Sequence, residues 1–137
     1  MSPRTKTIIS WIARAIAALI MLQTLFFKFT AAEESVYIFS SLHMEPWGRI
    51  GTGIMELIAS VLILIPRTTA IGALLALGLM GGAMLSHIFF LGIAVQGDRG
   101  QLFIYAAIVF FCALYLLIKN RRQLLTFVPS RYYETKD

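Results

Sequence analysis

The stretch AIGALLALGLMGGAMLSHIFFL, residues 70–91, decides the fold of this 137-residue chain. It contains no Lys, Arg, Asp or Glu, and a membrane-spanning helix needs about 20 consecutive apolar residues. Three further stretches have a similar character, at residues 8–29, 49–65 and 102–118. The sequence therefore predicts an all-α protein, a four-transmembrane-helix bundle formed as a single membrane domain over residues 1–137.

The composition supports this interpretation and excludes other classes of protein. Hydrophobic residues make up 58% of the chain and charged residues only 14%, whereas soluble domains carry about 25% charged residues. A single cysteine excludes a disulfide scaffold. The net charge of +5 is compatible with nucleic-acid binding, but the basic residues lie between apolar runs. We therefore expect a lipid bilayer, and no nucleic acid, as the partner.

The basic residues also predict the orientation of the chain in the membrane. Four spans place both termini on one side, and the connections on that side carry most of the Lys and Arg residues. These are Arg4, Lys6, Arg67, Lys119, Arg121, Arg122, Arg131 and Lys136, against Lys28, Arg49 and Arg99 on the other side. Because cytoplasmic loops are enriched in Lys and Arg, both termini are predicted to be cytoplasmic, in a bacterial-type inner membrane.

The segments between and after the spans have distinct characters. Residues 30–48 contain a short amphipathic stretch, 35–44, which predicts a helix on the outer membrane surface. The tail at residues 119–137 is basic, with interspersed apolar side chains. It fits an interfacial stretch or a site for anionic lipid or a cytoplasmic partner. Cleavage of the first span as a signal peptide is the alternative to its being a transmembrane helix.

Few ionisable side chains lie at membrane depth, and these are the informative positions because each costs several kcal/mol unless paired or hydrated. At a rise of about 1.5 Å per residue, Arg14 lies roughly 9 Å, Glu56 roughly 14 Å, His87 roughly 26 Å and Lys28 roughly 30 Å from the inner ends of their spans. These depths predict a buried ion pair between Arg14 and Glu56. They place Lys28 too far from Glu56 for contact.

An outer polar layer is predicted at the depth of His87 and Lys28. Gln23 and Thr24 on the first span and Gln101 and Tyr105 on the fourth lie at similar depth. We expect the layer to line a ligand pocket, with the binding residues Gln23, Lys28, Glu56, His87 and Tyr105. The alternative is a structural role, in which these groups fix helix register, reach the headgroups or bond a neighbouring helix.

No catalytic residue and no metal site are predicted. His43, Met44 and Glu45 are adjacent in sequence, and three adjacent residues make poor ligand geometry without further donors. Gly78 and Gly82 form a GxxxG pair, which Ser86 extends by a turn. This pattern permits close packing within one bundle and is also compatible with a homodimer.

Several of these residues resemble the DoxX family. They are Arg14, the stretch Phe27-Lys28-Phe29, the segment Gly53-Ile54-Met55-Glu56-Leu57, the exit Leu64-Ile65-Pro66-Arg67-Thr68, and His87. The resemblance covers about residues 8–95. It implies a four-helix membrane bundle. Members are linked to quinone-coupled sulfur oxidation, to membrane redox complexes that deal with oxidative stress and, in distant animal relatives, to receptor assembly.

Three functions follow as hypotheses. The first is a redox-associated subunit of a membrane oxidoreductase. It would bind quinone or another small apolar ligand and receive electrons from a partner protein. The second is a small proton-coupled transporter. The third is a non-catalytic scaffold or assembly factor, which would bind its partner through residues 30–48 and the basic tail.

Overall fold

A computed structural model describes residues 2–127, and all the regular structure in this range is helical. The α-helices are α1 (Pro3–Phe29), α2 (Glu33–Ser41), α3 (Trp47–Leu64), α4 (Thr69–Ser86) and α5 (Gln101–Asn120). A π-helical turn, η1 (His87–Leu91), continues α4, and a 3-10 helix, η2 (Arg121–Phe127), continues α5.

Four helical segments are long and apolar enough to cross a membrane, which confirms the four predicted spans. They are Pro3–Phe29, Trp47–Leu64, Thr69–Leu91 and Gln101–Thr126. The first begins five residues before the predicted start at residue 8, because Pro3 takes the first helical position and the Ser2 side chain accepts a hydrogen bond from the Thr5 N–H. A short helix is present between the first two spans, but α2 covers Glu33–Ser41 rather than the predicted residues 35–44. The tail from residue 128 lies outside the described residues.

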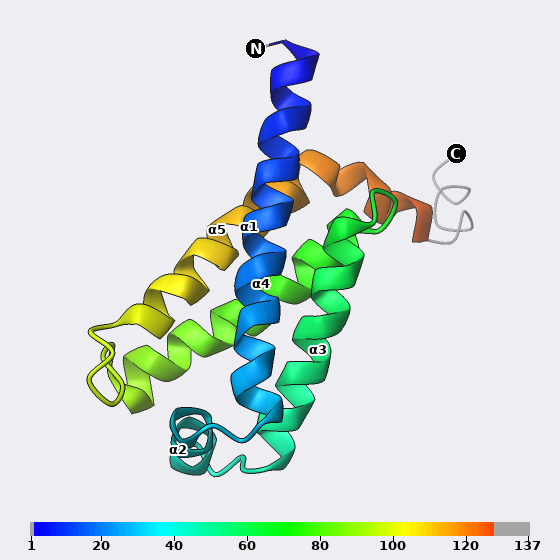
Figure 1. Ribbon diagram of the computed structural model, residues 1–137. Coiled ribbons are helices and arrows are strands. Elements are labelled where there is room, and N and C mark those ends of the chain that lie inside the picture. The colour runs from blue at the N-terminus through cyan, green and yellow to red at the C-terminus, as the bar shows by residue number, and fades with distance from the viewer. Residues whose placement is uncertain (1, 128–137) are drawn as a thin grey trace, which may run out of the picture.

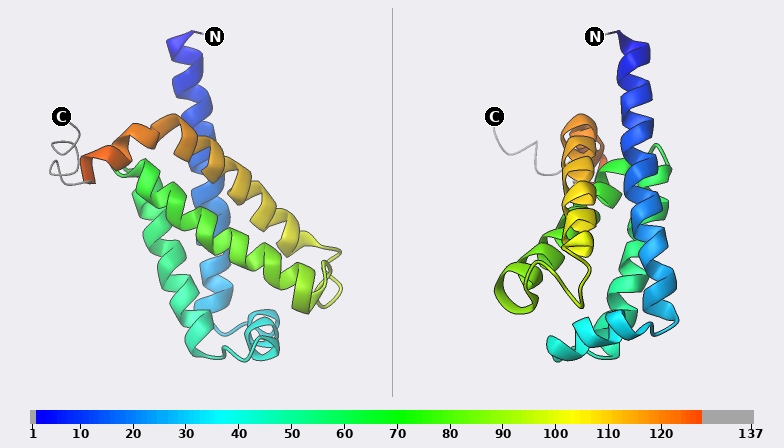
Figure 2. Two further views of the ribbon diagram at one scale, coloured as in Figure 1. Left: turned by 180° about the vertical axis from the view of Figure 1, so that it is seen from behind. Right: turned by 60° about the vertical axis from the view of Figure 1, so that its left-hand side comes forward.

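The four long helices form a ring in which each packs on two others. α1 packs on α3 and α5, and α4 packs on the same two helices from the other side. Figure 1 shows α4 and α5 as a hairpin inclined against the steeper pair α1 and α3. The second view shows α2 lying across the end of α1 and α3 (Figure 2). The start of α1 therefore lies at the opposite end of the molecule from α2.

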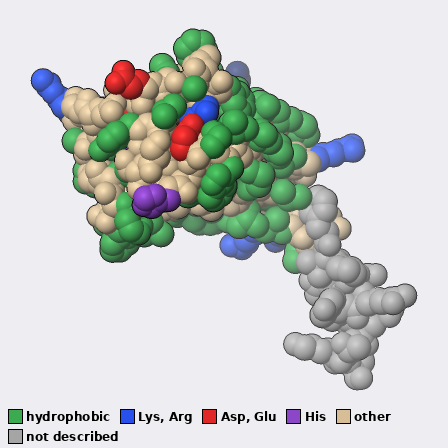
Figure 3. Space-filling view, turned by 90° about the horizontal axis from the view of Figure 1, so that it is seen from below, with side chains coloured by type: hydrophobic (Ala, Val, Ile, Leu, Met, Phe, Trp, Pro, Cys, Tyr) green, Lys and Arg blue, Asp and Glu red, His purple; other side chains and the backbone are tan. Residues whose placement is uncertain are grey.

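Small side chains make up much of the core of the ring. Ala17, Ala59, Ala73, Ala76 and Ala113 are fully buried, and such residues let helix backbones approach closely within a membrane. Large apolar side chains instead cover much of the exterior, as the view from the α2 end shows (Figure 3). This arrangement suits a protein surrounded by lipid, since helix association there depends on packing rather than on hiding apolar surface from water.

Candidate functional site

A buried ion pair joins α1 to α3. Lys28 Nζ donates to Glu56 Oε1, and the Thr24 hydroxyl donates to Glu56 Oε2 at 3.0 Å. The Glu56 side chain is only 5% exposed and that of Lys28 15%. The predicted pairing of Glu56 with Arg14 is therefore wrong, and the contact between Lys28 and Glu56 that the predicted depths excluded is present.

Two physical features explain this error. First, α1 starts at Pro3 and projects beyond the bundle, with residues 2–8 exposed. The inner ends of α1 and α3 are therefore not level, and depths measured from them do not share an origin. Second, helical side chains lean toward the N-terminus of their own helix. In the antiparallel pair α1 and α3, Lys28 and Glu56 lean toward one another and close the remaining gap.

Arg14 has a different environment. It is 7% exposed, and its guanidinium carbon lies 4.5 Å from the centroid of the Trp11 ring. Its Nε and Nη1 atoms have no hydrogen-bond partner among residues 2–127. Arg14 is thus held by a cation–π contact at the exposed Trp11 and lies in the N-terminal half of α1, away from the pair.

Arg49 fixes the end of α1 where Lys28 lies. Its Nη1 donates to the Lys28 carbonyl oxygen, and its Nε donates to the Glu45 carboxylate at 2.8 and 3.1 Å. A cation is favourable at a helix C-terminus, where carbonyl groups lack partners. Arg49 was expected only as an outer-side charge, but it positions the backbone that carries Lys28.

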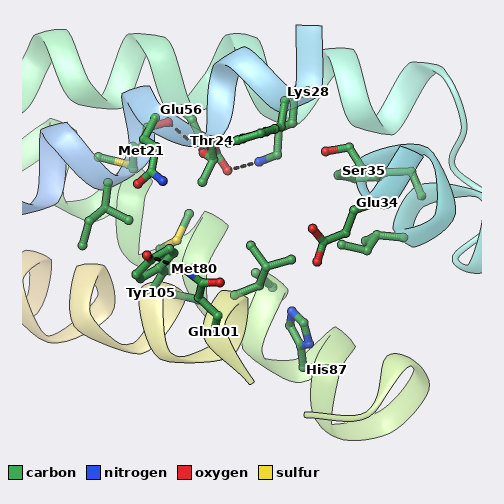
Figure 4. A pocket seen from close by; sticks show the side chains of 18 residues that line it. Met21, Thr24, Lys28, Glu34, Ser35, Glu56, Met80, His87, Gln101 and Tyr105 are labelled. Atoms are coloured by element: carbon green, nitrogen blue, oxygen red, sulfur yellow. Dashed lines mark hydrogen bonds and ion pairs between the residues drawn. The ribbon is translucent and has the colours of Figure 1, made fainter. Parts of the chain in front are cut away.

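A cavity of about 240 Å³ opens beside the ion pair. All five residues predicted to bind a ligand line it, from four different elements: Gln23 and Lys28 on α1, Glu56 on α3, His87 on η1 and Tyr105 on α5. Met21 and Met80 contribute apolar wall, and α2 adds Glu34 and Ser35 (Figure 4). The structure therefore brings the predicted set together, and its binding role remains a proposal.

His87 enters the cavity wall at the point where α4 changes into the π-helical turn η1. Its Nδ1 lies 3.0 Å from the carbonyl oxygen of Gly92. Because a carbonyl oxygen only accepts, Nδ1 carries the hydrogen, and the neutral ring then has its lone pair on Nε2. The edge of the ring also packs against Phe103, with centroids 5.9 Å apart. His87 is thus an oriented hydrogen-bond acceptor when neutral.

Tyr105 supplies the complementary group. Gln101 Nε2 donates to the Tyr105 hydroxyl oxygen at 2.7 Å, which leaves the phenolic hydrogen available for a further acceptor. Lys28 likewise has ammonium hydrogens beyond the one directed at Glu56. Lys28 and Tyr105 are therefore donors to the cavity, in addition to the acceptor His87.

Glu34 on α2 was missed by the sequence reasoning, which treated residues 30–48 as a connecting segment. Its Oε1 is buried and has no hydrogen-bond partner among residues 2–127, and the carboxyl group points into the cavity (Figure 4). Burial raises the pKa of Glu34, and the charge of Asp98 raises it further. The signal was present, because Glu34 and Ser35 precede Ile38 and Phe39 by four residues and so share a helix face.

Asp98 lies near the same rim and behaves in the opposite way. Burial acts to raise the pKa of its carboxyl, but backbone N–H groups of Val95, Gly100 and Leu102 donate to it, and together with His87 they hold the pKa below its usual value. Asp98 is therefore the fixed anion that caps the start of α5, whereas Glu34 is the group inclined to hold a proton.

Fold and site together define a helical membrane protein with a polar cavity between its spans. A family model described as the DoxX-like family matches residues 12–118. The chain belongs to this family, as the resemblance in Arg14, Lys28, Glu56 and His87 predicted. Comparisons with curated proteins and with solved structures gave no match.

The first prediction concerns the ion pair. Lys28→Leu is expected to lower the free energy of unfolding by about 3 kcal/mol, because it leaves the Glu56 carboxylate buried without a counter-charge. The double variant Lys28→Leu/Glu56→Leu should recover most of this loss, because removing both charges of a buried pair is far less costly. Denaturation of the purified protein in detergent measures both effects.

Arg14→Leu is the matched control and should change the free energy of unfolding by less than about 1 kcal/mol, since Arg14 has no carboxylate partner. A loss in Arg14→Leu as large as that in Lys28→Leu would contradict the assigned pairing.

The second prediction concerns pH. Since the pKa of Glu34 is raised above its ordinary value of 4.5, the folded state binds this proton more tightly than the unfolded state. The free energy of unfolding should therefore fall as the pH rises from 4.5 through the raised pKa. Glu34→Gln should flatten that part of the stability profile, and Glu33→Gln at the exposed neighbour should leave it unchanged.

Asp98 does not interfere in this range, because its lowered pKa removes stability only as the pH falls below about 3.8. Identical profiles for Glu34→Gln and the wild type above pH 4.5 would refute the assignment.

Proposed function

We propose that this DoxX-like protein is a redox-associated membrane subunit whose cavity binds the headgroup of a quinone or quinol. One observation carries the proposal. Hydrogen-bond donors and acceptors from four separate elements, at Lys28, Glu34, His87 and Tyr105, surround a single cavity between membrane-spanning helices. A structural role for these groups would not require an open volume between them.

The size and chemistry of the cavity fit a ring-shaped headgroup. Its volume of about 240 Å³ is slightly below the roughly 300 Å³ at which pockets for drug-sized ligands begin. A quinone takes up two electrons and two protons to become a quinol, so its oxygens need donors in one state and acceptors in the other. Lys28 and Tyr105 can donate to a carbonyl oxygen, and neutral His87 and ionised Glu34 can accept from a hydroxyl.

The ionisable residues supply a route for protons, while electrons would pass to or from a partner redox protein. Glu34 lies on α2, at the end of the bundle, and its raised pKa favours proton exchange. His87 lines the same cavity, and the lone pair on its Nε2 can accept a proton from a bound hydroxyl group. We assign proton exchange to these two groups rather than to Arg14.

In the proposed orientation the protein lies in a bacterial-type inner membrane, with both termini on the cytoplasmic side. The basic residues of the described chain divide unequally between the ends of the helices. Those at the end where α1 begins are Arg4, Lys6, Arg67, Lys119, Arg121 and Arg122, against Lys28, Arg49 and Arg99 at the α2 end. Lys119 even reaches α1, with its Nζ donating to the Lys6 carbonyl oxygen at 2.8 Å. The excess supports a cytoplasmic position for that end.

The third prediction tests ligand binding. Protein purified from its own membranes should retain quinone, detected by organic extraction and chromatography, and added quinone should raise the melting temperature. His87→Leu should retain at least about fivefold less, the factor expected for one lost hydrogen bond of about 1 kcal/mol. His43→Leu is the matched control, because His43 is exposed and does not line the cavity.

Two results would contradict the proposal. The first is wild-type protein that carries no quinone and shows no thermal response to added quinone. The second is an equal loss of quinone in His43→Leu, which would separate binding from the cavity.

A further inference from the structure

α3 and α4 form a V that is closed at one end and open at the other. At the closed end, a Cβ atom placed on Gly72 would lie 2.6 Å from the backbone nitrogen of Ile63 and 2.9 Å from the carbonyl oxygen of Ala59. Farther along α4, a Cβ atom on Gly78 or Gly82 would meet nothing within 4 Å. The two helices therefore diverge toward the α2 end, as both views of the ribbon show (Figures 1 and 2).

A second cavity of about 270 Å³ lies in this opening. It is bounded by Thr52 on α3, by the small residues of α4 and, at its open end, by α2. It shares Lys28, Glu56 and His87 with the first cavity. We name this second cavity the interhelical groove. The ion pair and His87 thus stand where the groove and the headgroup cavity meet.

The groove is apolar beyond that junction. Apart from Lys28, Glu56 and His87, the polar side chains in its wall are Thr52 and Ser86. The hydroxyl group of each donates to a carbonyl oxygen of its own helix at 2.8 Å. Their hydroxyl hydrogens are therefore not available to a ligand. Gly78 and Gly82 line the groove and are nevertheless exposed. In a membrane-spanning helix, that combination places the groove mouth against the lipid.

We propose that the interhelical groove holds the hydrocarbon tail of the ligand whose headgroup occupies the first cavity, and that the ligand enters sideways from the bilayer between α3 and α4. The ligand class is then a lipid-soluble ring compound with one long apolar chain. This inference rests on the proposed function. Two features support the proposed tail site. The polar cavity continues into an apolar groove, and the groove opens to lipid beside Gly78 and Gly82.

The fourth prediction concerns a substitution that narrows the groove. In Gly82→Leu the new side chain would extend into the groove without touching the headgroup cavity, which Gly82 does not line. Affinity for a long-tailed quinone should fall about tenfold or more, because the new side chain competes with the tail for the same space. Affinity for a tail-less benzoquinone should stay within about twofold. Both affinities are measured by binding titration in detergent or nanodiscs.

Gly51→Leu is the matched control, because a side chain at Gly51 also meets open space and Gly51 lines neither cavity. It should bind both compounds like the wild type. Gly78→Leu provides a second obstruction of the groove if Gly82→Leu does not fold, and it should show the same selective loss.

The possible outcomes separate the two claims. Selective loss of the long-tailed compound in Gly82→Leu or Gly78→Leu supports the groove. Unchanged binding of both compounds, or an equal loss of both, overturns the groove and leaves the headgroup site standing. A wild type that binds neither compound refutes the proposed function, and the groove with it.

Discussion

The contact between Lys28 and Glu56 is the interaction on which the α2 end of the molecule depends. Two opposite charges lie at membrane depth, where burying either charge alone would cost free energy. Neighbouring residues hold both members of the pair in place. Thr24 donates to the second oxygen of Glu56, and Arg49 donates to the carbonyl oxygen of Lys28. The pair therefore ties α1 to α3 while α4 and α5 incline away. A buried ion pair is weak evidence for stability, and its position at the junction of two cavities favours a role in ligand binding.

Three further polar groups in or beside the cavity differ in how far their hydrogen bonds are satisfied. Asp98 is satisfied by three backbone N–H groups, and His87 is oriented by the Gly92 carbonyl oxygen. Glu34 by contrast has a buried oxygen without a partner in the described chain. Buried polar groups in native structures are mostly hydrogen-bonded, so this oxygen can accept a bond from a ligand or a water molecule. The unsatisfied carboxyl lies on the short helix α2, which forms the outer wall of the cavity.

The spans could be predicted from sequence because hydropathy is a local property, and residues 70–91 carry it in every window. The residues that line the cavity could also be predicted. Gln23, His87 and Tyr105 are polar or ionisable side chains at similar depth in predicted membrane spans, where burying such groups costs free energy. The partner of Glu56 could not, because it depends on how far α1 projects and on the lean of two side chains. Glu34 was missed because its burial comes from the docking of α2 on the bundle. The spacing to Ile38 places it on the same helix face but does not show where that face docks.

Photochemical labelling would test the central claim most directly. An azido-substituted quinone is added to the protein in nanodiscs and irradiated, and the labelled residues are mapped by mass spectrometry. The structure predicts labels on the cavity walls formed by α2 and α5, near Ser35 and Tyr105, which excess unlabelled quinone should suppress. Labels confined to exposed outer side chains such as Phe89 and Phe90, with no suppression by unlabelled quinone, would contradict the account.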